Sequence, residues 1–389
     1  MLVVNSGSSS VKLAVVDPST GQRSMTALAE EVGSSAAVVH VRRGDREGSA
    51  PPGDGSHGGI VAHVLSTLTD DERGALVGVG HRVVHGGPRF TDSVVVDAEV
   101  LAALREVVEL APLHVPANMA GIEAAREQLP DLAHVAVFDT AFHSTMPPVA
   151  QRYAVPQAWF DEHHVRRYGA HGTSHRYLAG RTAELLGRTT EGLRLVTLHL
   201  GNGCSAAAIL DDRSMDTTMG LTPLEGLVMG TRSGDVDANL VGYAASRLGL
   251  DLDGVLEVLN SESGLLGLSG LSNDMRTLTE AAAGGSAPAR LAVDVFCYRA
   301  AKGVAGLVVA LGGLDALVFS GGIGEHSVEV RSLVLGHLAF LGLAEDEAAN
   351  GEHGASTGGR ISTGDRPVAM VVPTDEELVI ARDTVALTA

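Results

Sequence analysis

The chain has 389 residues, with 28 Lys and Arg against 47 Asp and Glu, so its formal net charge is −19. Such an acidic chain is poorly suited to nucleic acid, because binding to phosphates requires clustered Lys and Arg that displace counterions. Hydrophobic residues make up 45% of the sequence, enough for a large core, and the length indicates about two domains. Disordered and fibrous classes are therefore excluded.

Cysteine usage and hydropathy indicate a cytoplasmic protein that does not enter a membrane. Cys204 and Cys297 are the two cysteines and lie in apolar runs, which is typical of a reducing compartment. No basic segment precedes an apolar stretch at the N-terminus, so no signal peptide is expected. The most apolar stretch, 303–319, contains four glycines and Asp315. It predicts a buried helix followed by a strand instead of a membrane span.

Short β-branched runs alternate along the chain with segments rich in Ala, Leu and Glu. Residues 2–4 and 195–198 are predicted strands, and 99–110 is a predicted helix. The segment 42–59, rich in Gly, Pro and charge, is predicted to be a surface loop. The alternation indicates an α/β class.

Two segments of the chain resemble each other. Residues 2–17 read LVVNSGSSSVKLAVVD and residues 196–211 read VTLHLGNGCSAAAILD, so that without gaps Gly7 aligns with Gly201 and Ser10 with Cys204. Each predicts a strand, a glycine-containing turn and a second strand; a chance likeness of two hairpins is the alternative. Because the copies open the two halves of the chain, they predict a duplicated, two-lobed architecture with a cleft between the lobes.

The first of these turns, NSGSSSVK at 5–12, gathers an amide, four hydroxyls and an ammonium. A polar hairpin loop is the alternative interpretation. Lys12 is expected among the apolar residues of the returning strand, where an unpaired ammonium is costly. A glycine turn can approach phosphate oxygens closely, and Ser adds hydroxyl donors. The segment therefore predicts a phosphate partner.

Further polar clusters follow short apolar runs, where a strand would end at a ligand site. Arginines on such loops can present their guanidinium groups to a carboxylate or a phosphoryl group. A glycine turn that opens a helix, as in FSGGIGEH, is typical of a nucleotide site. The clusters are HRVVHGG at 81–87, LHVPAN at 113–118, FDTAFH at 138–143, RYGAHGTSH at 167–175, MGTRSGDVD at 229–237 and FSGGIGEH at 319–326.

Several histidines in these segments have a structural alternative. We favour a core or surface role for His85, His143, His163 and His164. Zinc is not expected, although His171 and His175 are four residues apart, because no carboxylate completes a metal-binding motif on a predicted helix.

Together the motifs resemble the acetate kinase (acetokinase) family, in order and across essentially the whole chain. The matching segments are NSGSSSVK, HRVVHGG, APLHVPAN, VFDTAFH, RRYGAHGTSH, HLGNG, GLTPLEGLVMGTRSGDVD, SNDMR, SGGIGEH and PTDEELVIARDT. The resemblance implies an α/β, duplicated, ribonuclease H-like fold of two lobes around a central cleft, shared with actin, sugar kinases and heat-shock ATPases. The expected lobes are 1–145, completed by 372–389, and a nucleotide-binding lobe 146–371.

The resemblance also implies an activity. The expected reaction is reversible, direct in-line phosphoryl transfer between ATP and acetate, giving acetyl phosphate and ADP. Mg²⁺, or Mn²⁺ in its place, is the implied cofactor. A cytoplasmic homodimer is the implied assembly.

Roles are carried over position by position. Asp139, His171, Arg232 and Arg82 are the implied catalytic residues, and Asn5 and Glu376 are the implied metal site. Arg82, Val84, Leu113 and Pro223 are the implied acetate site, the last three as the pocket for its methyl group. The implied nucleotide-binding residues are Lys12, His199, Leu200, Gly201, Asn202, Gly203, Asp274, Met275, Arg276, Gly322, Ile323, Gly324, Glu325 and His326.

The chemistry of a carboxylate acceptor supports this assignment. Acetate is already an anion at neutral pH, so it needs positive charge beside it more than a general base. Asp139 is therefore interpreted mainly as a residue that orients an arginine or the water shell of the metal.

Three other functions stay open. One is a propionate or broader short-chain acyl kinase, and another is a sugar kinase on the same fold, which would place a catalytic Asp in a hydroxyl-binding pocket. The third is an ATP-dependent interaction module of the heat-shock type, which is expected to carry a peptide-binding region after its lobes.

The sequence departs from the family pattern at three positions. Ala170 stands where the family usually has Phe, which bears on selectivity between acetate and propionate. His326 replaces an Asn that follows GGIGE, which bears on adenine or ribose contacts. Asp375 replaces an Asn before the paired glutamates and is expected to add a negative charge near the metal.

Overall fold

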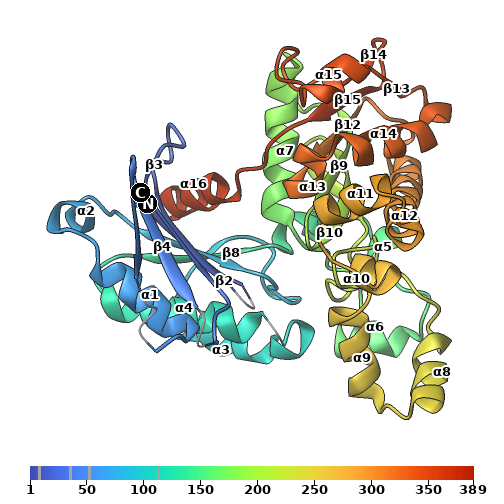
Figure 1. Cartoon of the computed structure of the whole chain (residues 1–389). Helices are drawn as coiled ribbons and strands as arrows, with labels where there is room; N and C mark the ends of the chain where they lie inside the picture. The colour runs from blue at the N-terminus through green and yellow to red at the C-terminus, as the bar shows by residue number, and fades with distance from the viewer. Residues whose placement is uncertain (8–9, 35–36, 51–53, 113) are drawn as a thin grey trace. The chain divides into compact units, whose positions relative to one another are not determined.

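The computed structural model describes residues 1–7, 10–34, 37–50, 54–112 and 114–389 (Figure 1). They form two compact units, each with its own β-sheet. Unit 1 comprises Met1–Phe142 and Asp375–Ala389, and unit 2 comprises His143–Thr374. The expected α/β class is confirmed.

The sheet of unit 1 has the strand order β5-β4-β3-β2-β1-β6-β8-β7. Strands β1 to β5 form an antiparallel meander, whereas β1, β6 and β8 run parallel to one another. The strands are β1 Leu2–Ser6, β2 Ser10–Val16, β3 Arg23–Glu30, β4 Val38–Arg43, β5 Arg46–Ala50, β6 Val79–Val83, β7 Val94–Val95 and β8 His134–Phe138.

Helices cover both faces of this sheet. Helices α1 and α4 pack on the face that carries Leu2 and Val4 of β1, and α16 packs on the other face (Figure 1). Gly80 of β6 allows this close approach, because a Cβ atom there would lie 2.5 Å from Cγ2 of Ile380 on α16. The helices of unit 1 are α1 His57–Ser66, α2 Asp70–Gly74, α3 Ala98–Glu106, α4 Val115–Gln128 and α16 Glu376–Thr388.

The sheet of unit 2 has the strand order β11-β10-β9-β12-β15, and β13 pairs with β14 beside it. Alternate residues of β9 face opposite sides: Val196 and Leu198 join the core formed with α12, whereas Thr197 and His199 bond to residues of α7. The strands are β9 Arg194–Leu200, β10 Cys204–Leu210, β11 Arg213–Thr217, β12 Ala316–Ser320, β13 Ala344–Glu345, β14 Ser362–Thr363 and β15 Val368–Val371.

Helices of unit 2 surround this sheet, with α7 and α12 on opposite faces (Figure 1). They are α5 Pro148–Gln151, α6 Gln157–His163, α7 Gly172–Leu185, α8 Asn239–Leu248, α9 Leu252–Ser261, α10 Gly264–Ser269, α11 Met275–Ala283, α12 Ala287–Leu311, α13 Gly321–His326, α14 Val328–His337 and α15 Glu347–Gly351.

The two units repeat one arrangement of strands. The order β3-β2-β1-β6-β8 of unit 1 corresponds to β11-β10-β9-β12-β15 of unit 2, with two antiparallel pairs followed by two parallel pairs in each. The ungapped alignment of 2–17 with 196–211 places the end of β1 on the end of β9, and β2 on β10. The internal similarity is therefore a structural repeat and not a chance likeness.

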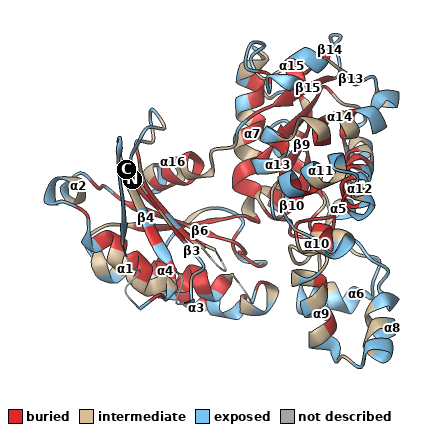
Figure 2. Ribbon diagram, viewed as in Figure 1, coloured by how far each residue is buried: buried red, intermediate tan, exposed pale blue. Residues whose placement is uncertain are grey.

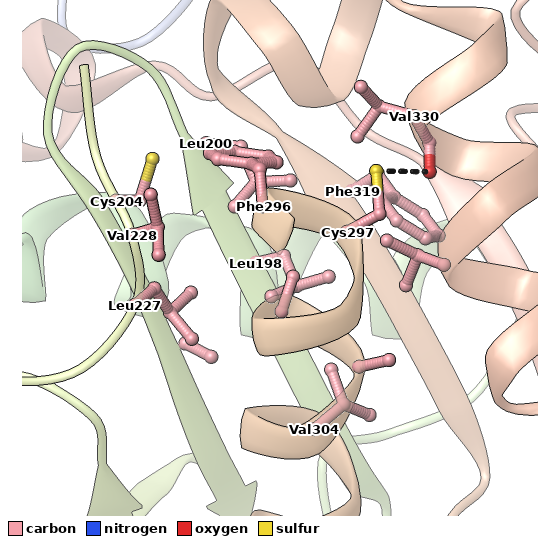
Figure 3. Close-up of a cluster of buried hydrophobic side chains, with 14 of the residues drawn as sticks. Leu198, Leu200, Cys204, Leu227, Val228, Phe296, Cys297, Val304, Phe319 and Val330 are labelled. Atoms are coloured by element: carbon pink, nitrogen blue, oxygen red, sulfur yellow. Dashed lines mark hydrogen bonds between the residues drawn. The ribbon is translucent and has the colours of Figure 1, made fainter. Parts of the chain in front are cut away.

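The core of unit 2 lies between β9, β10, β12 and the long helix α12. Figure 3 shows Leu198 and Leu200 of β9 beside Phe296 of α12. Cys204 and Cys297 belong to the same buried cluster as free thiols, and burial raises the pKa of each to about 12. In Figure 2 the strands β9 and β10 are largely buried, while α8 is coloured as exposed or intermediate along its length.

The structure tests several expected elements. The predicted strands and the predicted helix at 99–110 are confirmed, the helix as α3 followed by a 3₁₀ turn at Val108–Leu110. The predicted loop at 42–59 is wrong in part, because β4 and β5 form a hairpin through a turn at 44–45 and α1 begins at His57. In the part of the chain that the structure describes, no helix has the length and apolar character required to cross a lipid bilayer.

Candidate active site

Unit 1 brings Asn5, Arg82 and Asp139 together. Arg82 lies near the end of β6 and Asp139 directly follows β8, so neighbouring parallel strands deliver both side chains to the same edge of the sheet. The Arg82 guanidinium donates from Nε to Asp139 Oδ1 at 3.0 Å and from Nη2 to Oδ2 at 2.6 Å. It also donates from Nη1 to Asn5 Oδ1 at 3.3 Å. Three residues that the sequence separates widely therefore form one polar group.

The charge of Arg82 is fixed by its surroundings. Burial alone would lower the pKa of Arg82, but the negative charges of Asp139 and Glu376 outweigh this and raise the pKa further above its ordinary value. Glu376 is the first residue of α16. The two expected metal ligands therefore both interact with the Arg82 guanidinium, Asn5 through a hydrogen bond and Glu376 through its negative charge.

Asp139 is placed as an orienting residue for Arg82. Its side chain is only 1% exposed, and both carboxylate oxygens accept hydrogen bonds from one guanidinium. Such a bidentate pair fixes the plane and the direction of the arginine. The orienting role that carboxylate chemistry suggests for Asp139 stays a prediction.

Asn118 joins the ends of β1 and β6, and sequence reasoning missed its role. The buried amide accepts from the backbone N–H of Val84 at 3.0 Å and donates to the carbonyl of Ser6 at 2.5 Å. It fixes the backbone just after Asn5 and just after Arg82. A polar residue inside the otherwise apolar start of α4 is the signal that could have revealed it.

Lys12 corrects one step of the sequence analysis. Its side chain is exposed on β2, so the argument that a buried ammonium requires an anion is wrong. Alternation along the strand places Lys12 on the opposite face from its apolar neighbours. Lys12 lies directly opposite Asn5 in the β1–β2 pair, so it still lies beside this polar group. Ser8 and Ser9 of the same turn, and Leu113 of the expected acetate site, lie outside the described residues.

In unit 2 the turn between β9 and β10 contacts the loop that carries Arg232. The backbone N–H of Gly201 donates to the carbonyl of Gly203 at 3.0 Å, and the Cys204 thiol donates to the carbonyl of Gly201 at 3.2 Å. The carbonyl of Asn202 accepts from the backbone N–H of Gly230 at 2.9 Å. Two predicted segments, the HLGNG turn and the MGTRSGDVD loop, are thereby held together.

His171 and Arg232 converge beside Gly203. A Cβ atom on Gly203 would lie 3.5 Å from His171 Nε2 and 3.6 Å from Arg232 Nη1. We call this small space the Gly203 corner. Because Gly203 has no side chain, two nitrogens that can donate hydrogen bonds border a space that an oxygen atom could occupy.

The Arg232 guanidinium lacks a countercharge within the described residues, where no carboxylate forms an ion pair with it. Nη1 donates to the carbonyl of Pro223 at 3.0 Å and contacts Met229 Sδ at 3.7 Å. Burial lowers the pKa of Arg232. A partly buried cation without a carboxylate partner favours binding of an anion. Pro223, expected to line an apolar pocket, uses its carbonyl oxygen to hold Arg232.

The histidines of the predicted motifs have different surroundings. His171 begins α7 with a left-handed backbone (φ 55°) and its ring stacks on His199 with centroids 4.3 Å apart. His143 is buried, bonds to Ser214 Oγ and the carbonyl of Ala170, and burial lowers its pKa to about 4. The structural role favoured for His143 fits this placement. His85 is buried and accepts from the backbone of Gly87, whereas His163 and His164 are exposed.

A pocket of about 870 Å³ in unit 2 gathers the other predicted nucleotide segments. It includes residues from the β9–β10 turn, the start of α11, and α13. Asp274 caps α11 by accepting from the backbone N–H of Thr277 at 2.8 Å. Asn273, not predicted, donates to Asn202 Oδ1 at 3.1 Å and links two of the segments. The lining residues are Gly201, Asn202, Asn273, Asp274, Met275, Arg276, Thr279, Gly322, Ile323, His326, Ser327, Val328 and Glu329.

Five other predicted nucleotide-binding residues of unit 2 are not among those that line this pocket. Glu325 turns back to accept from the backbone N–H of Gly321 at 3.0 Å, and Gly324 is buried in α13. His199 and Leu200 end β9, and Gly203 belongs to the Gly203 corner.

The three departures from the family pattern have distinct surroundings. Ala170 is buried in the core of unit 2. His326 lines the pocket, and its ring packs edge-on against His353 with centroids 6.2 Å apart. Asp375 caps α16 through the backbone N–H of Leu378 and forms an ion pair with Arg23 at 2.5 Å. Arg23 also forms an ion pair with Glu377 at 2.6 Å, so its single positive charge offsets the charge of Asp375 only in part.

Comparison with known proteins places the chain in a family. The model of the acetokinase family matches residues 1–382. An acetate kinase of Deinococcus radiodurans is 54% identical over 387 residues, covering 99% of this chain and 97% of the relative. Two solved structures are similar over nearly the full length of both chains. A propionate kinase of Francisella tularensis has 41% identity, a TM-score of 0.94 and 99% coverage of each chain. The Porphyromonas gingivalis acetate kinase has 39% identity and a TM-score of 0.91, covering 100% of this chain and 99% of the other.

The family model, the full-length relatives, the repeated fold and the two polar groups agree, and the chain belongs to the acetokinase family.

Proposed function

We propose that the chain catalyses reversible phosphoryl transfer between ATP and acetate, giving ADP and acetyl phosphate. The observation that carries this proposal is the Gly203 corner, where His171 and Arg232 converge on one small space. Gly201 and Asn202 of the same turn line the large pocket of unit 2. Membership of the acetokinase family supports the same reaction.

The nucleotide is proposed to bind in the pocket of unit 2. Arg276 supplies positive charge there, and the turn at Gly201 and Asn202 offers backbone groups to phosphate oxygens. A nucleotide bound in this way would have its terminal phosphoryl group at the Gly203 corner. Arg232 and His171 would then donate to the oxygens on which charge accumulates, which is the main requirement for catalysis of phosphoryl transfer.

The acyl acceptor is assigned to the polar group of unit 1. Arg82, oriented by Asp139, would bind the acetate carboxylate, and Val84, with Leu113 and Pro223, would contact its methyl group. Because the acceptor is already ionised, Asp139 need not remove a proton. The phosphoryl group can pass directly from one oxygen to the other, without a covalent intermediate on the enzyme.

Asn5 and Glu376 would hold Mg²⁺, or Mn²⁺ in its place. Within the described residues no cluster of three or more His, Cys, Asp or Glu side chains forms a metal cage. One amide oxygen and one carboxylate nevertheless fit Mg²⁺, which proteins commonly bind through one or two oxygen ligands together with substrate phosphates. When bound, the ion would neutralise charge on the phosphates of the nucleotide.

We also propose a homodimer in the cytoplasm. Helices α8 and α9 expose apolar side chains, among them Leu240, Tyr243, Leu248 and Leu252, and a second copy of this chain is the occupant that we assign to this face. Both cysteines are buried free thiols, which suits a reducing compartment. Light scattering should give twice the chain mass for the native protein and a lower mass for Tyr243→Asp.

Trapping of the product with hydroxylamine tests the proposed reaction. Purified chain, ATP and Mg²⁺ are combined with acetate, propionate, butyrate or glycerol, and acyl hydroxamate is measured together with ADP. Acetate should give hydroxamate in proportion to ADP, whereas glycerol should give neither. ADP formation with glycerol and none with acetate would favour a sugar or polyol kinase instead.

Propionate is a second candidate substrate because the chain resembles a propionate kinase over its full length and has Ala170 in place of the usual Phe. Where this position borders the acyl group, a side chain smaller than Phe would leave room for one more methylene, which is worth about 1–3 kcal/mol of discrimination in an apolar pocket. We expect acetate to remain the better substrate. Ala170→Phe, if folded and active, should shift the ratio of kcat/KM further towards acetate; an unchanged ratio would remove Ala170 from the account of selectivity.

A further inference from the structure

His171 is connected to three buried polar side chains on the sheet side of α7. His171 Nδ1 lies 2.9 Å from Ser205 Oγ, and the same hydroxyl lies 2.8 Å from His175 Nε2. On the other side of the ring, His175 Nδ1 lies 2.7 Å from Thr197 Oγ1. Ser205, His175 and Thr197 are each fully buried. The four residues thus form a linear chain of three hydrogen bonds.

Proton counting allows two arrangements of this chain. A neutral imidazole has one N–H and one acceptor nitrogen, and each hydroxyl supplies one proton. Burial and the nearby His143 and His199 hold the pKa of His175 well below its ordinary value, so His175 is neutral. In the first arrangement Thr197 donates to His175, His175 donates to Ser205, and Ser205 donates to His171 Nδ1. In the second arrangement every one of these bonds is reversed.

The environment of Thr197 selects the first arrangement. Within the described residues, His175 Nδ1 is the one hydrogen-bond partner of the Thr197 hydroxyl. In the reversed arrangement the buried Thr197 O–H would have no acceptor there, and an unsatisfied buried donor is strongly disfavoured. In the first arrangement every N–H and O–H proton of the three buried residues is donated to a partner.

We infer that Ser205 and His175 hold His171 as the neutral tautomer that carries its proton on Nε2. This nitrogen borders the Gly203 corner. His171 can then donate to a phosphoryl oxygen without first becoming an imidazolium. The inference rests on the proposed function for its catalytic meaning, but the tautomer is a property of the protein alone. Ser205 and His175 are positioning residues, since they act through His171.

Nitrogen NMR of the full-length enzyme measures the tautomer directly. The protein is labelled with ¹⁵N-histidine, and the ring signals of His171 are assigned by their loss in His171→Gln. At about pH 7.5 the spectrum should show His171 protonated on Nε2 and unprotonated on Nδ1. A proton on Nδ1, or on both nitrogens, would overturn the inference even if the enzyme makes acetyl phosphate. Absence of acyl phosphate formation would instead refute the proposed function, whatever the tautomer.

Kinetics test whether Ser205 acts through His171. Ser205→Ala should lower kcat by about 10- to 100-fold, the range seen when a group that orients a functional histidine is removed, with little change in the KM for ATP. In a His171→Ala background the same substitution should change kcat less than about twofold, because the residue it positions is gone. Equal losses in both backgrounds would show a general structural role and contradict the inference.

Ser214→Ala is the matched control. Ser214 is also fully buried and bonds to a histidine, with its Oγ 2.8 Å from His143 Nδ1. The Ser214 hydroxyl bonds to His143 and not to His171. Ser214→Ala should leave the His171 ring signals in place; a change of the His171 tautomer in this variant would mean that any buried serine in this core has the same effect.

Discussion

Arg82 and Arg232 carry the same charge but have different partners. Arg82 is held by both oxygens of the buried Asp139, whereas Arg232 donates to a backbone carbonyl and forms no ion pair within the described residues. Removal of Arg82 takes the bidentate partner from a carboxylate that is 1% exposed, whereas removal of Arg232 breaks no ion pair within the described residues. Activity and stability should therefore respond differently to the two substitutions.

Arg232→Ala is expected to lose activity while the fold remains stable. The loss of one group that stabilises transition-state charge costs about 2.7–4 kcal/mol, or roughly 100- to 1000-fold in kcat. Arg82→Ala should lose activity and also about 3–5 kcal/mol of stability, because it breaks a buried ion pair. Steady-state kinetics and urea unfolding of both variants check this contrast. Near-normal turnover in a folded Arg232→Ala enzyme would show that this charge is not used.

At the scale of secondary-structure elements, α13 is held in place by a residue of α14. Arg331 is fully buried and donates from Nη1 to the carbonyls of Gly324 and Glu325, both at 2.9 Å. It also donates to Asn350 Oδ1 at 2.6 Å and to His353 Nδ1 at 2.9 Å. Burial lowers the pKa of Arg331 to about 10. One guanidinium thus fixes the end of the glycine-rich helix that borders the pocket.

Arg331→Leu should weaken nucleotide binding more than it slows turnover. The substitution leaves the α13 carbonyls without their donor, at a cost of about 1–3 kcal/mol for each buried group. We expect the Kd for ADP, measured by calorimetry, to rise about tenfold or more, with partial recovery in Arg331→Lys. Lower thermal stability with an unchanged Kd would mean that Arg331 supports the fold and not the pocket.

Local sequence patterns predicted strands, turns and helices, whereas features that depend on tertiary contacts could not be predicted from these patterns. The glycine turns at Gly7 and Gly201 were visible because β-branched runs flank them. The β4–β5 hairpin was missed because charged residues flank its turn, Arg42 and Arg43 before it and Arg46 and Glu47 after it, although Gly44 and Asp45 are a typical two-residue turn. Lys12 was misjudged because apolar neighbours in sequence lie on the other face of a strand.

The candidate site was predictable where a residue type itself carries the chemistry. Arginines, Asp139 and glycine turns can be recognised in a sequence, whereas the roles of Asn118 and Ser205 depend on which distant groups they meet. Asn118 bonds to residues 34 and 112 positions away, and Ser205 to residues 34 and 30 positions away. Such bonds follow from topology, which a single sequence does not display.

At the scale of the whole molecule, both units contain buried histidines that stay neutral. Burial lowers the pKa of His81 in unit 1 and of His175 in unit 2 well below the ordinary value, and lowers that of His143 from 6.5 to about 4. Between about pH 6.5 and pH 4 the unfolded chain binds protons at these positions that the folded chain does not. Stability should therefore rise with pH in this window.

Acid should destabilise the native protein through these histidines. His143 alone accounts for roughly 3 kcal/mol between about pH 7 and pH 4. The urea concentration at the midpoint of unfolding should decrease when the pH is lowered from about 7 to about 5. His143→Gln should make this decrease smaller. His163→Gln, which changes an exposed histidine, should leave it as in the native protein. A urea midpoint that does not depend on pH would refute the claim that these histidines are buried in their neutral form.

The repeated sheet gives each unit a hairpin turn at the same edge, but the two turns have different polar surroundings. The turn of unit 1 lies near Arg82 and Asp139, and that of unit 2 near His171 and Arg232. We assign the acyl acceptor to the first group and the phosphoryl group to the second, so that the Gly203 corner receives phosphoryl oxygens.

Activity of Gly203→Ala tests this claim most directly. The new methyl would lie at ordinary contact distances of 3.4 to 3.6 Å from its nearest neighbours, so the variant should fold, but it would fill the space between His171 and Arg232. Gly180→Ala on α7, where a Cβ meets nothing within 4 Å, is the control. We expect Gly203→Ala to lower acetyl phosphate formation by about 100-fold or more, with native circular dichroism and an active control. Gly203→Ala that folds and retains near-native turnover would contradict it.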